Sequence, residues 1–328
     1  GARDARTAIE IDSSCGAVGC RGFCSQGPLV YLPGLDVLYC RVALDDVDEI
    51  IEMTLGRSEV VERLLFSDPA SGRRCRGLAD NPFFALQDRQ ITARCGVVDP
   101  EDVDHAVALG AYDALRQAVL DLDPAQVVDL VKRSGLQERG GAGFPVGLKW
   151  AVVADAPAEI KYVIGNGEGG DPGLTADRTL LEGDPHGIIE GMAIAGFAVG
   201  AREGRLFLRS SHDLIAVRAE RAVADALQRG FLGSRIFGSS FGFSIEICDS
   251  AGASMGGEES SMLNAIQGRR GVARPRPPYP TVSGLWGRPT LINSFETLAN
   301  IPLIVLSGRT DTDPPPARTK LVSVTGAV

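Results

Sequence analysis

A glycine-rich segment near the middle of the chain carries the residue types best suited to chemistry. Residues 138–145 read Glu-Arg-Gly-Gly-Ala-Gly-Phe-Pro, and Lys149 follows shortly after. Glycine brings no side chain and lets the backbone turn tightly and approach another group closely. Backbone N–H groups, the cations Arg139 and Lys149, and the ring of Phe144 together suit a phosphorylated aromatic cofactor. The alternative is a glycine-rich turn that only joins two helices.

Two further glycine-rich segments occur downstream, each after an expected strand. Residues 165–173 follow the apolar run 161–164, and residues 251–257 follow the run 243–247. In parallel sheets the carboxyl ends of the strands share one edge, and ligands bind at that edge. A parallel sheet would therefore bring these segments into one nucleotide- or flavin-binding pocket.

The rest of the chain alternates helices and strands, which predicts an α/β fold with a mainly parallel sheet covered on both faces. Asp99-Pro100 and Asp123-Pro124 mark helix starts, because a capping Asp precedes Pro at the first helical position. The expected helices are 45–55, 99–120, 124–134, 183–201, 213–229, 258–266 and 294–306, and the expected strands are 29–32, 37–42, 161–164, 206–208, 243–247 and 321–325. The expected linker is the polar segment 67–81.

Composition narrows the function classes. The net charge of -9 argues against nucleic acid as a partner, since nucleic-acid binding needs a basic face. No apolar run is long enough to span a bilayer, so we expect no direct membrane insertion. Seven cysteines are scattered through the chain, and only Cys15, Cys20 and Cys24 cluster. This usage favours a reducing compartment, the cytoplasm or an organelle matrix.

Taken in order, the three glycine-rich loops resemble the flavin-carrying, NADH-oxidising subunit of respiratory complex I. They are similar as well to its relatives in NAD(P)-linked hydrogenases, formate dehydrogenases and electron-bifurcating complexes. Residues 139–150 match the family's flavin loop, residues 166–186 its second motif, and residues 257–271 its third. The resemblance continues through residues 277–287 and 296–302 and covers the chain from about Ile11 to its end.

The resemblance implies a set of site residues. Phe144, Asp171 and Glu259 would hold the substrate NAD(H), the ring by stacking and the carboxylates by accepting from ribose hydroxyls or the carboxamide. Glu168 and Glu259 are the candidate catalytic residues. The residues implied for FMN are Arg139, Gly140, Gly141, Ala142, Gly143, Lys149, Asn166, Glu168, Gly257, Glu258, Asn293 and Thr297.

The resemblance also implies a domain organisation. Residues 82–320 would form a Rossmann-like FMN-binding domain, and residues 1–66 the C-terminal part of a thioredoxin-like ferredoxin domain. Residues 321–328 would open a ubiquitin-like domain that is cut short. Cys20 and Cys24 resemble the second cysteine pair of a 2Fe–2S site, which needs four ligands. We therefore expect an incomplete ligand set here, with iron–sulfur clusters in the missing portions or in partner subunits.

The implied reaction is hydride transfer from NADH or NADPH to FMN, followed by one-electron transfer to iron–sulfur subunits of a larger redox complex. The alternative is a non-catalytic assembly paralogue whose flavin site is lost or weakened. It arises because Glu138, Ser254 and Ser294 stand where the family usually has a glycine, an aromatic residue and an asparagine. Of these, Glu138 is expected to weaken the phosphate end of the site most, so that Glu138→Gly would tighten FMN binding.

Overall fold

The chain forms two compact units, residues 1–89 and residues 90–328. The structure, a computed structural model, describes residues 16–168, 176–209, 213–250, 257–308 and 319–324. In these ranges no helix is both long and apolar enough to cross a membrane.

The first unit is built on two small antiparallel hairpins. Strand β1 (Val30–Leu32) pairs with β2 (Val37–Tyr39), and β3 (Phe66–Ser67) pairs with β4 (Arg74–Cys75). Helix α1 (Val47–Glu49) runs on as a π-helix (Ile50–Gly56), and α2 (Pro82–Ala85) follows the second hairpin. Segment 67–81, which we expected to be a linker, thus contains strand β4 and lies within this unit.

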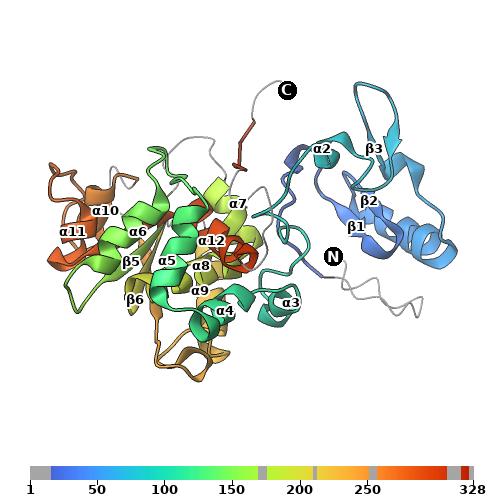
Figure 1. Cartoon of the computed structure of the whole chain (residues 1–328). Helices are drawn as coiled ribbons and strands as arrows, with labels where there is room; N and C mark the ends of the chain where they lie inside the picture. The colour runs from blue at the N-terminus through green and yellow to red at the C-terminus, as the bar shows by residue number, and fades with distance from the viewer. Residues whose placement is uncertain (1–15, 169–175, 210–212, 251–256, 309–318, 325–328) are drawn as a thin grey trace. The chain divides into compact units, whose positions relative to one another are not determined.

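The second unit contains a four-stranded sheet in which every neighbouring pair of strands is parallel. Its strands are β5 (Tyr162–Gly167), β6 (Glu203–Leu208), β7 (Ser244–Asp249) and β8 (Thr290–Ser294), in the order β7-β6-β5-β8. This confirms the predicted parallel α/β sheet. Strands β5 and β6 are labelled in Figure 1. Strand β8 was not predicted. The chain leaves β5 toward β6 on one side and returns to β8 on the other, so the strand order reverses beside β5. That reversal is where open α/β sheets hold ligands.

Ten helices surround the sheet within the described ranges of the second unit. They are α3 (Val103–Ala108), α4 (Asp113–Asp121), α5 (Pro124–Arg133), α6 (Val146–Asp155), α7 (Ala176–Gly183), α8 (Pro185–Val199), α9 (Asp213–Gln228), α10 (Glu259–Ile266), α11 (Pro280–Ser283) and α12 (Phe295–Ser307). Residues 99–120, predicted as one helix, form α3 and α4 instead. Gly110 and Tyr112 have φ of 84° and 68°, a left-handed backbone that interrupts a right-handed helix. The strand predicted at 321–325 is also wrong over residues 321–324, which have no regular structure.

Strands β5, β6 and β8 are buried over most of their length, whereas the residues of edge strand β7 are exposed or part-exposed. Val163, Leu206 and Leu291 belong to the large core that includes residues of α6, α8 and α12. Their chain neighbours Ile164, Phe207 and Ile292 belong to a smaller core with Met262 and Leu263 of α10.

Helix α12 approaches helix α8 very closely. A Cβ atom added to Gly191 of α8 would lie 2.2 Å from the backbone oxygen of Leu298 in α12. Only glycine allows this spacing of the two backbones. The close contact fixes α12, whose first residue directly follows the last residue of β8.

Candidate functional site

The three sequence motifs meet at the carboxyl edge of the sheet, beside the reversal of strand order. In the parallel pairing of β5 with β8, Gly165 lies opposite Asn293 and Asn166 opposite Ser294. The glycine loop 138–145 reaches the same edge, because the backbone N–H of Arg139 donates to Thr297 Oγ1 at 2.9 Å. The first loop is therefore tied to the start of α12.

The glycine loop is closed at its base and open at its tip. The backbone N–H of Glu138 donates to the carbonyl of Phe144 at 2.8 Å, which makes the segment a tight loop. Gly141 and Gly143 have φ of 123° and 65°, values that side chains other than glycine disfavour. The loop backbone is exposed, and the Phe144 ring is 50% exposed. This leaves backbone groups and an aromatic face available to a ligand.

Lys149, in the first turns of α6, connects the first and third motifs. Its Nζ lies 3.2 Å from Glu138 Oε2 and 3.6 Å from Glu259 Oε1. The same ammonium donates to the carbonyl of Ile292 in β8 at 2.7 Å. One cation thus holds together the first loop, the start of α10 and the end of β8.

Glu138 does not stand at the mouth of the loop; its carboxylate lies inside, among converging donors. Besides Lys149, it accepts from Asn293 Nδ2 at 2.6 Å, Ser294 N at 3.0 Å, Ser294 Oγ at 3.1 Å and Thr297 Oγ1 at 2.6 Å. Burial acts to raise the pKa of Glu138, but the Lys149 charge and these hydrogen bonds outweigh it and lower that pKa. The side chain is therefore an ionised carboxylate in a preformed anion cradle.

Other side chains orient the cradle. The indole Nε1 of Trp150 donates to Asn293 Oδ1 at 3.1 Å, which turns the amide so that its Nδ2 faces Glu138. Ser294 is the N-cap of α12, since its Oγ accepts from the backbone N–H of Thr297 at 3.3 Å. The cradle therefore also lies at a helix N-terminus, where the helix dipole favours an anion.

Glu168, after β5, presents a buried oxygen without a hydrogen-bond partner among the residues that the structure describes. Its Oε1 accepts from Arg209 Nη2 at 2.7 Å, whereas Oε2 has no hydrogen-bond partner within the described ranges. A Cβ atom on Gly257 would lie 3.7 Å from that Oε2, so the oxygen is close to the third loop. A buried acceptor of this kind needs a donor, which a bound ligand can supply.

The two acids of the third motif have different environments. Glu258 caps α10 by accepting from the backbone N–H of Ser261 at 2.8 Å, and it pairs with Arg276. Burial acts to raise its pKa, but hydrogen bonds from Ser260, Ser261 and Arg276 prevail and lower the pKa to about 2. Glu259 is shared between Lys149 and Arg276, the latter at 3.1 Å, and is part-exposed. The two side chains are similarly exposed, 24% for Glu258 and 27% for Glu259, so they differ in their partners rather than in their accessibility.

Arg139 and Asp171 are not placed at the site with the others. The Arg139 side chain donates from Nη2 to the carbonyl of Thr319 at 2.9 Å, and its Nε lies 3.8 Å from Glu296 Oε1. The expected pair of cations at the loop is thus one cation, Lys149, with a backbone contact from Arg139. Asp171 lies outside the described residues.

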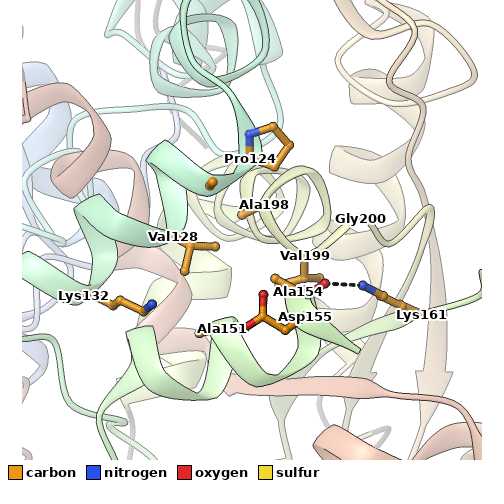
Figure 2. Close-up of a pocket in the computed structure, with 11 residues that line it drawn as sticks. Pro124, Val128, Lys132, Ala151, Ala154, Asp155, Lys161, Ala198, Val199 and Gly200 are labelled. Carbon is orange, nitrogen blue, oxygen red and sulfur yellow. Dashed lines mark hydrogen bonds between the residues drawn. The ribbon is translucent and has the colours of Figure 1, made fainter. Parts of the chain in front are cut away.

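Figure 2 shows a pocket of about 390 Å³ at the opposite edge of the sheet. It lies among α5, α6 and α8, next to Lys161 and Gly200, which shortly precede β5 and β6. Lys161 Nζ donates to the carbonyl of Ala154 at 2.7 Å. None of the predicted site residues lines this pocket, so it is separate from the loop cluster. Its lining residues are Pro124, Ala125, Val128, Lys132, Ala151, Ala154, Asp155, Lys161, Ala198, Val199 and Gly200.

In the first unit, the sulfur atoms of Cys20 and Cys24 lie 3.6 Å apart on exposed side chains. The backbone N–H of Gly22 donates to Cys20 Sγ at 3.2 Å. Cys15 lies outside the described residues. Within the described part of the chain, no group of three or more potential ligands is arranged around a metal position.

Sequence reasoning missed several residues that shape the site. Arg209 directly follows β6 and binds Glu168, so its place at the carboxyl end of a strand was a usable signal. Arg276, which was not among the predicted site residues, pairs with both acids of the third motif. Trp150 is fully buried and also orients Asn293.

A parallel α/β sheet with the glycine loop 138–145, residues 165–168 and the start of α10 at the reversal of its strand order defines a nucleotide- or flavin-binding class of protein. Comparison with known proteins makes this specific. Residues 131–303 match the family model described as the Nuo51 FMN-binding domain. The chain belongs to this family.

Relatives and solved structures agree with that assignment. The NADP-reducing hydrogenase subunit HndC of Solidesulfovibrio fructosivorans is 47% identical over 68% of this chain and 45% of its own length. An NADH-quinone oxidoreductase subunit of Escherichia coli is 40% identical over 64% of this chain and 47% of its own. The crystal structure of an NAD+-reducing NiFe-hydrogenase in the air-oxidised state superposes with a TM-score of 0.54 at 26% identity, covering 87% of this chain and 44% of that one. The matched region spans about half the length of these proteins.

The described residues fit a flavin in part. The glycine loop, the exposed Phe144 ring and the unpaired Glu168 Oε2 suit a polar, flat ligand. The anion cradle does not suit a phosphate in the same way, because the Glu138 carboxylate already accepts its hydrogen bonds.

Proposed function

We propose that this chain is the flavin-binding module of an NAD(P)H-oxidising redox protein. The observation that carries the proposal is the meeting of the three loop motifs at the carboxyl ends of β5 and β8, next to the unpaired Glu168 oxygen. A bound flavin supplies the redox chemistry, since it accepts a hydride and releases electrons one at a time. The protein's part is to bind, orient and shield.

Roles follow for the residues of the site. The backbone of Gly140, Gly141, Ala142 and Gly143, together with Asn166, Gly257 and Asn293, would contact the flavin. Glu168 Oε2 would accept a hydrogen bond from an N–H or O–H group of the flavin, which would satisfy that buried acceptor. Phe144 would stack on a ring of the dinucleotide, and Glu259 would accept from its hydroxyls. Asp171 would serve the dinucleotide in the same way.

Partners and surroundings are proposed on the same basis. The names of the relatives are those of subunits of NADH-quinone oxidoreductases and of an NADP-reducing hydrogenase, which supports electron transfer to iron–sulfur partners. The ferredoxin-like assignment of residues 1–66 rests on the neighbouring Cys20 and Cys24. The scattered cysteines favour the cytoplasm or an organelle matrix.

Flavin reconstitution tests the proposal. We expect the purified chain, incubated with riboflavin or FMN and then desalted, to retain the visible bands of an oxidised flavin. Anaerobic NADH or NADPH should bleach them. The matched variant is Glu168→Gln, which keeps the side-chain volume. Its amide puts an NH2 donor in the place of one carboxylate oxygen, so the acceptor that faces the flavin is lost and flavin retention should weaken. Absence of flavin binding in the unmodified chain would leave the assembly-paralogue alternative.

A further inference from the structure

The anion cradle contains all the elements of a phosphate site, yet its ligand is part of the chain. An ammonium, a helix N-terminal N–H, two hydroxyls and an amide converge on Glu138 from α6, β8 and α12. These are the donor types that proteins use for phosphate. With all of them engaged, an incoming anion has no free donor in the cradle.

We propose that the Glu138 carboxylate is a built-in occupant of this cradle and excludes phosphate groups from it. The inference rests on the proposed function where it concerns flavins. Its consequence is that this chain does not favour a flavin with a terminal phosphate over riboflavin, the form without one.

The charges around Lys149 support the exclusion of phosphate from the cradle. Lys149 Nζ already lies within 4.0 Å of two carboxylates, those of Glu138 and Glu259. Asp177 also senses the carboxylates here: burial is the main cause that raises its pKa to about 7, and the charges of Glu296 and Glu138 raise it as well. A phosphate added at this position would be a third anion next to one lysine. Like charges held this close repel.

The covalent attachment of the Glu138 carboxylate to the loop also supports the exclusion of phosphate. Glu138 Oε1 lies 4.0 Å from the position of a Cβ atom on Gly140, so the loop closes directly over the carboxylate. The loop is already ordered by the hydrogen bond from Arg139 N to Thr297 Oγ1. A free phosphate must compete with a group that loses no translational freedom on binding.

The test compares the unmodified chain with Glu138→Gly, using orthophosphate, FMN and riboflavin as probes. Glu220→Gln, which removes one charge from the exposed side of α9, is the control. In thermal unfolding we expect orthophosphate to raise the Tm of Glu138→Gly, relative to chloride of equal ionic strength. The unmodified chain and the control should not respond.

In titrations, the unmodified chain should bind FMN and riboflavin with dissociation constants within about threefold of each other. In Glu138→Gly, FMN should bind about 10- to 100-fold more tightly than riboflavin, as expected for charge-assisted hydrogen bonds to a phosphate. Glu138→Ala also removes the carboxylate from the cradle and replaces the glycine variant if that variant does not fold.

The outcomes separate the two proposals. An unmodified chain that binds FMN more than about tenfold tighter than riboflavin would show that phosphate displaces the carboxylate, and would overturn the inference. Equal phosphate responses of the unmodified chain and Glu138→Gly would overturn it too. If no flavin binds to any variant but phosphate stabilises only Glu138→Gly, the built-in occupant stands and the proposed function fails.

Discussion

At the scale of the residue, the site is organised by buried or part-buried ion pairs rather than by one reactive group. Glu138 and Lys149 are both close to 10% exposed, so each depends on the other for compensation of its charge. Arg209 does the same for Glu168. These pairs differ from the exposed pair of Arg133 and Asp129 on α5, in which water screens both charges.

Lys149→Met should therefore lower the free energy of unfolding more than the loss of a cation from an exposed ion pair would. It leaves the Glu138 carboxylate buried without its cation, and we expect a loss of about 2–4 kcal/mol in the free energy of unfolding. In the double variant with Glu138→Gly, part of this loss should disappear, with a coupling energy of about 1–3 kcal/mol. Denaturant unfolding of the unmodified chain, the two single variants and the double variant measures this coupling energy.

The control for this cycle is Arg133→Met, which should cost less than about 0.5 kcal/mol. Additive losses from Lys149→Met and Glu138→Gly would contradict the compensation described for this pair.

The residue scale also shows what sequence could and could not foresee. A carboxylate next to a glycine loop was evident at Glu138, and we predicted repulsion of an anion there. Its interior position was not predictable, because it depends on Asn293, Ser294 and Thr297, which are more than 150 residues away along the chain. The contact between Lys149 and Glu259 is likewise set by tertiary folding alone.

At the scale of the element, local sequence signals predicted well where they matched the backbone. Asp123 followed by Pro124 gave the start of α5, with a full capping box from Gln126. Local signals failed where one residue changed the backbone direction, as at Tyr112 between α3 and α4. Strand β8 was missed because only Leu291 and Ile292 of its five residues are apolar and because it joins α12 without a turn that would mark its end.

The contact between α8 and α12 gives a prediction for one glycine. In Gly191→Ala the added methyl group would meet the backbone of Leu298, which cannot move aside as a side chain can. We expect a loss of about 1–3 kcal/mol, despite the better helix propensity of alanine. Both tryptophans of the chain, Trp150 and Trp286, lie in the second unit, so their fluorescence during denaturant unfolding reports this change.

Gly187→Ala on the same helix is the comparison, since the heavy atoms nearest to its methyl group would be side-chain atoms of Asp184 and Arg94. A smaller loss is expected there. Equal losses at both positions would mean that the backbone approach of α8 and α12 is not the limiting contact.

At the scale of the whole molecule, the second unit buries ionisable groups in its interior as well as at the site. Glu190 of α8 accepts from the backbone N–H of Leu115 at 3.0 Å, and Tyr112 hydrogen-bonds His186 at 2.7 Å. Burial is the main cause that raises the pKa of Glu190 from 4.5 to about 7 and lowers that of His186 from 6.5 to about 4. These shifts couple the stability of the fold to pH.

The two groups act in opposite directions. The contribution of Glu190 is complete below pH 4.5 and is lost as pH rises to about 7, because only the unfolded chain ionises in that range. The contribution of His186 is complete above pH 6.5 and is lost as pH falls toward 4. Glu190→Gln keeps an acceptor for the backbone N–H of Leu115. As pH rises through that window, the free energy of unfolding of this variant should fall by about 2–3 kcal/mol less than that of the unmodified chain.

Unfolding free energies measured across the same pH range check this prediction, with Glu220→Gln as the control for an exposed carboxylate. Parallel pH profiles of Glu190→Gln and the unmodified chain would show that Glu190 is ionised in the fold.

The direct junction of β8 and α12 has a consequence for the order in which the chain folds and binds its cofactor. Ser294 ends the strand, caps the helix and donates to the Glu138 carboxylate, so the chain's own residues satisfy the anion cradle at this edge of the sheet. Nascent polypeptide can thus reach its final form there before any cofactor arrives. Loading of a flavin becomes a late step of maturation, separable from folding.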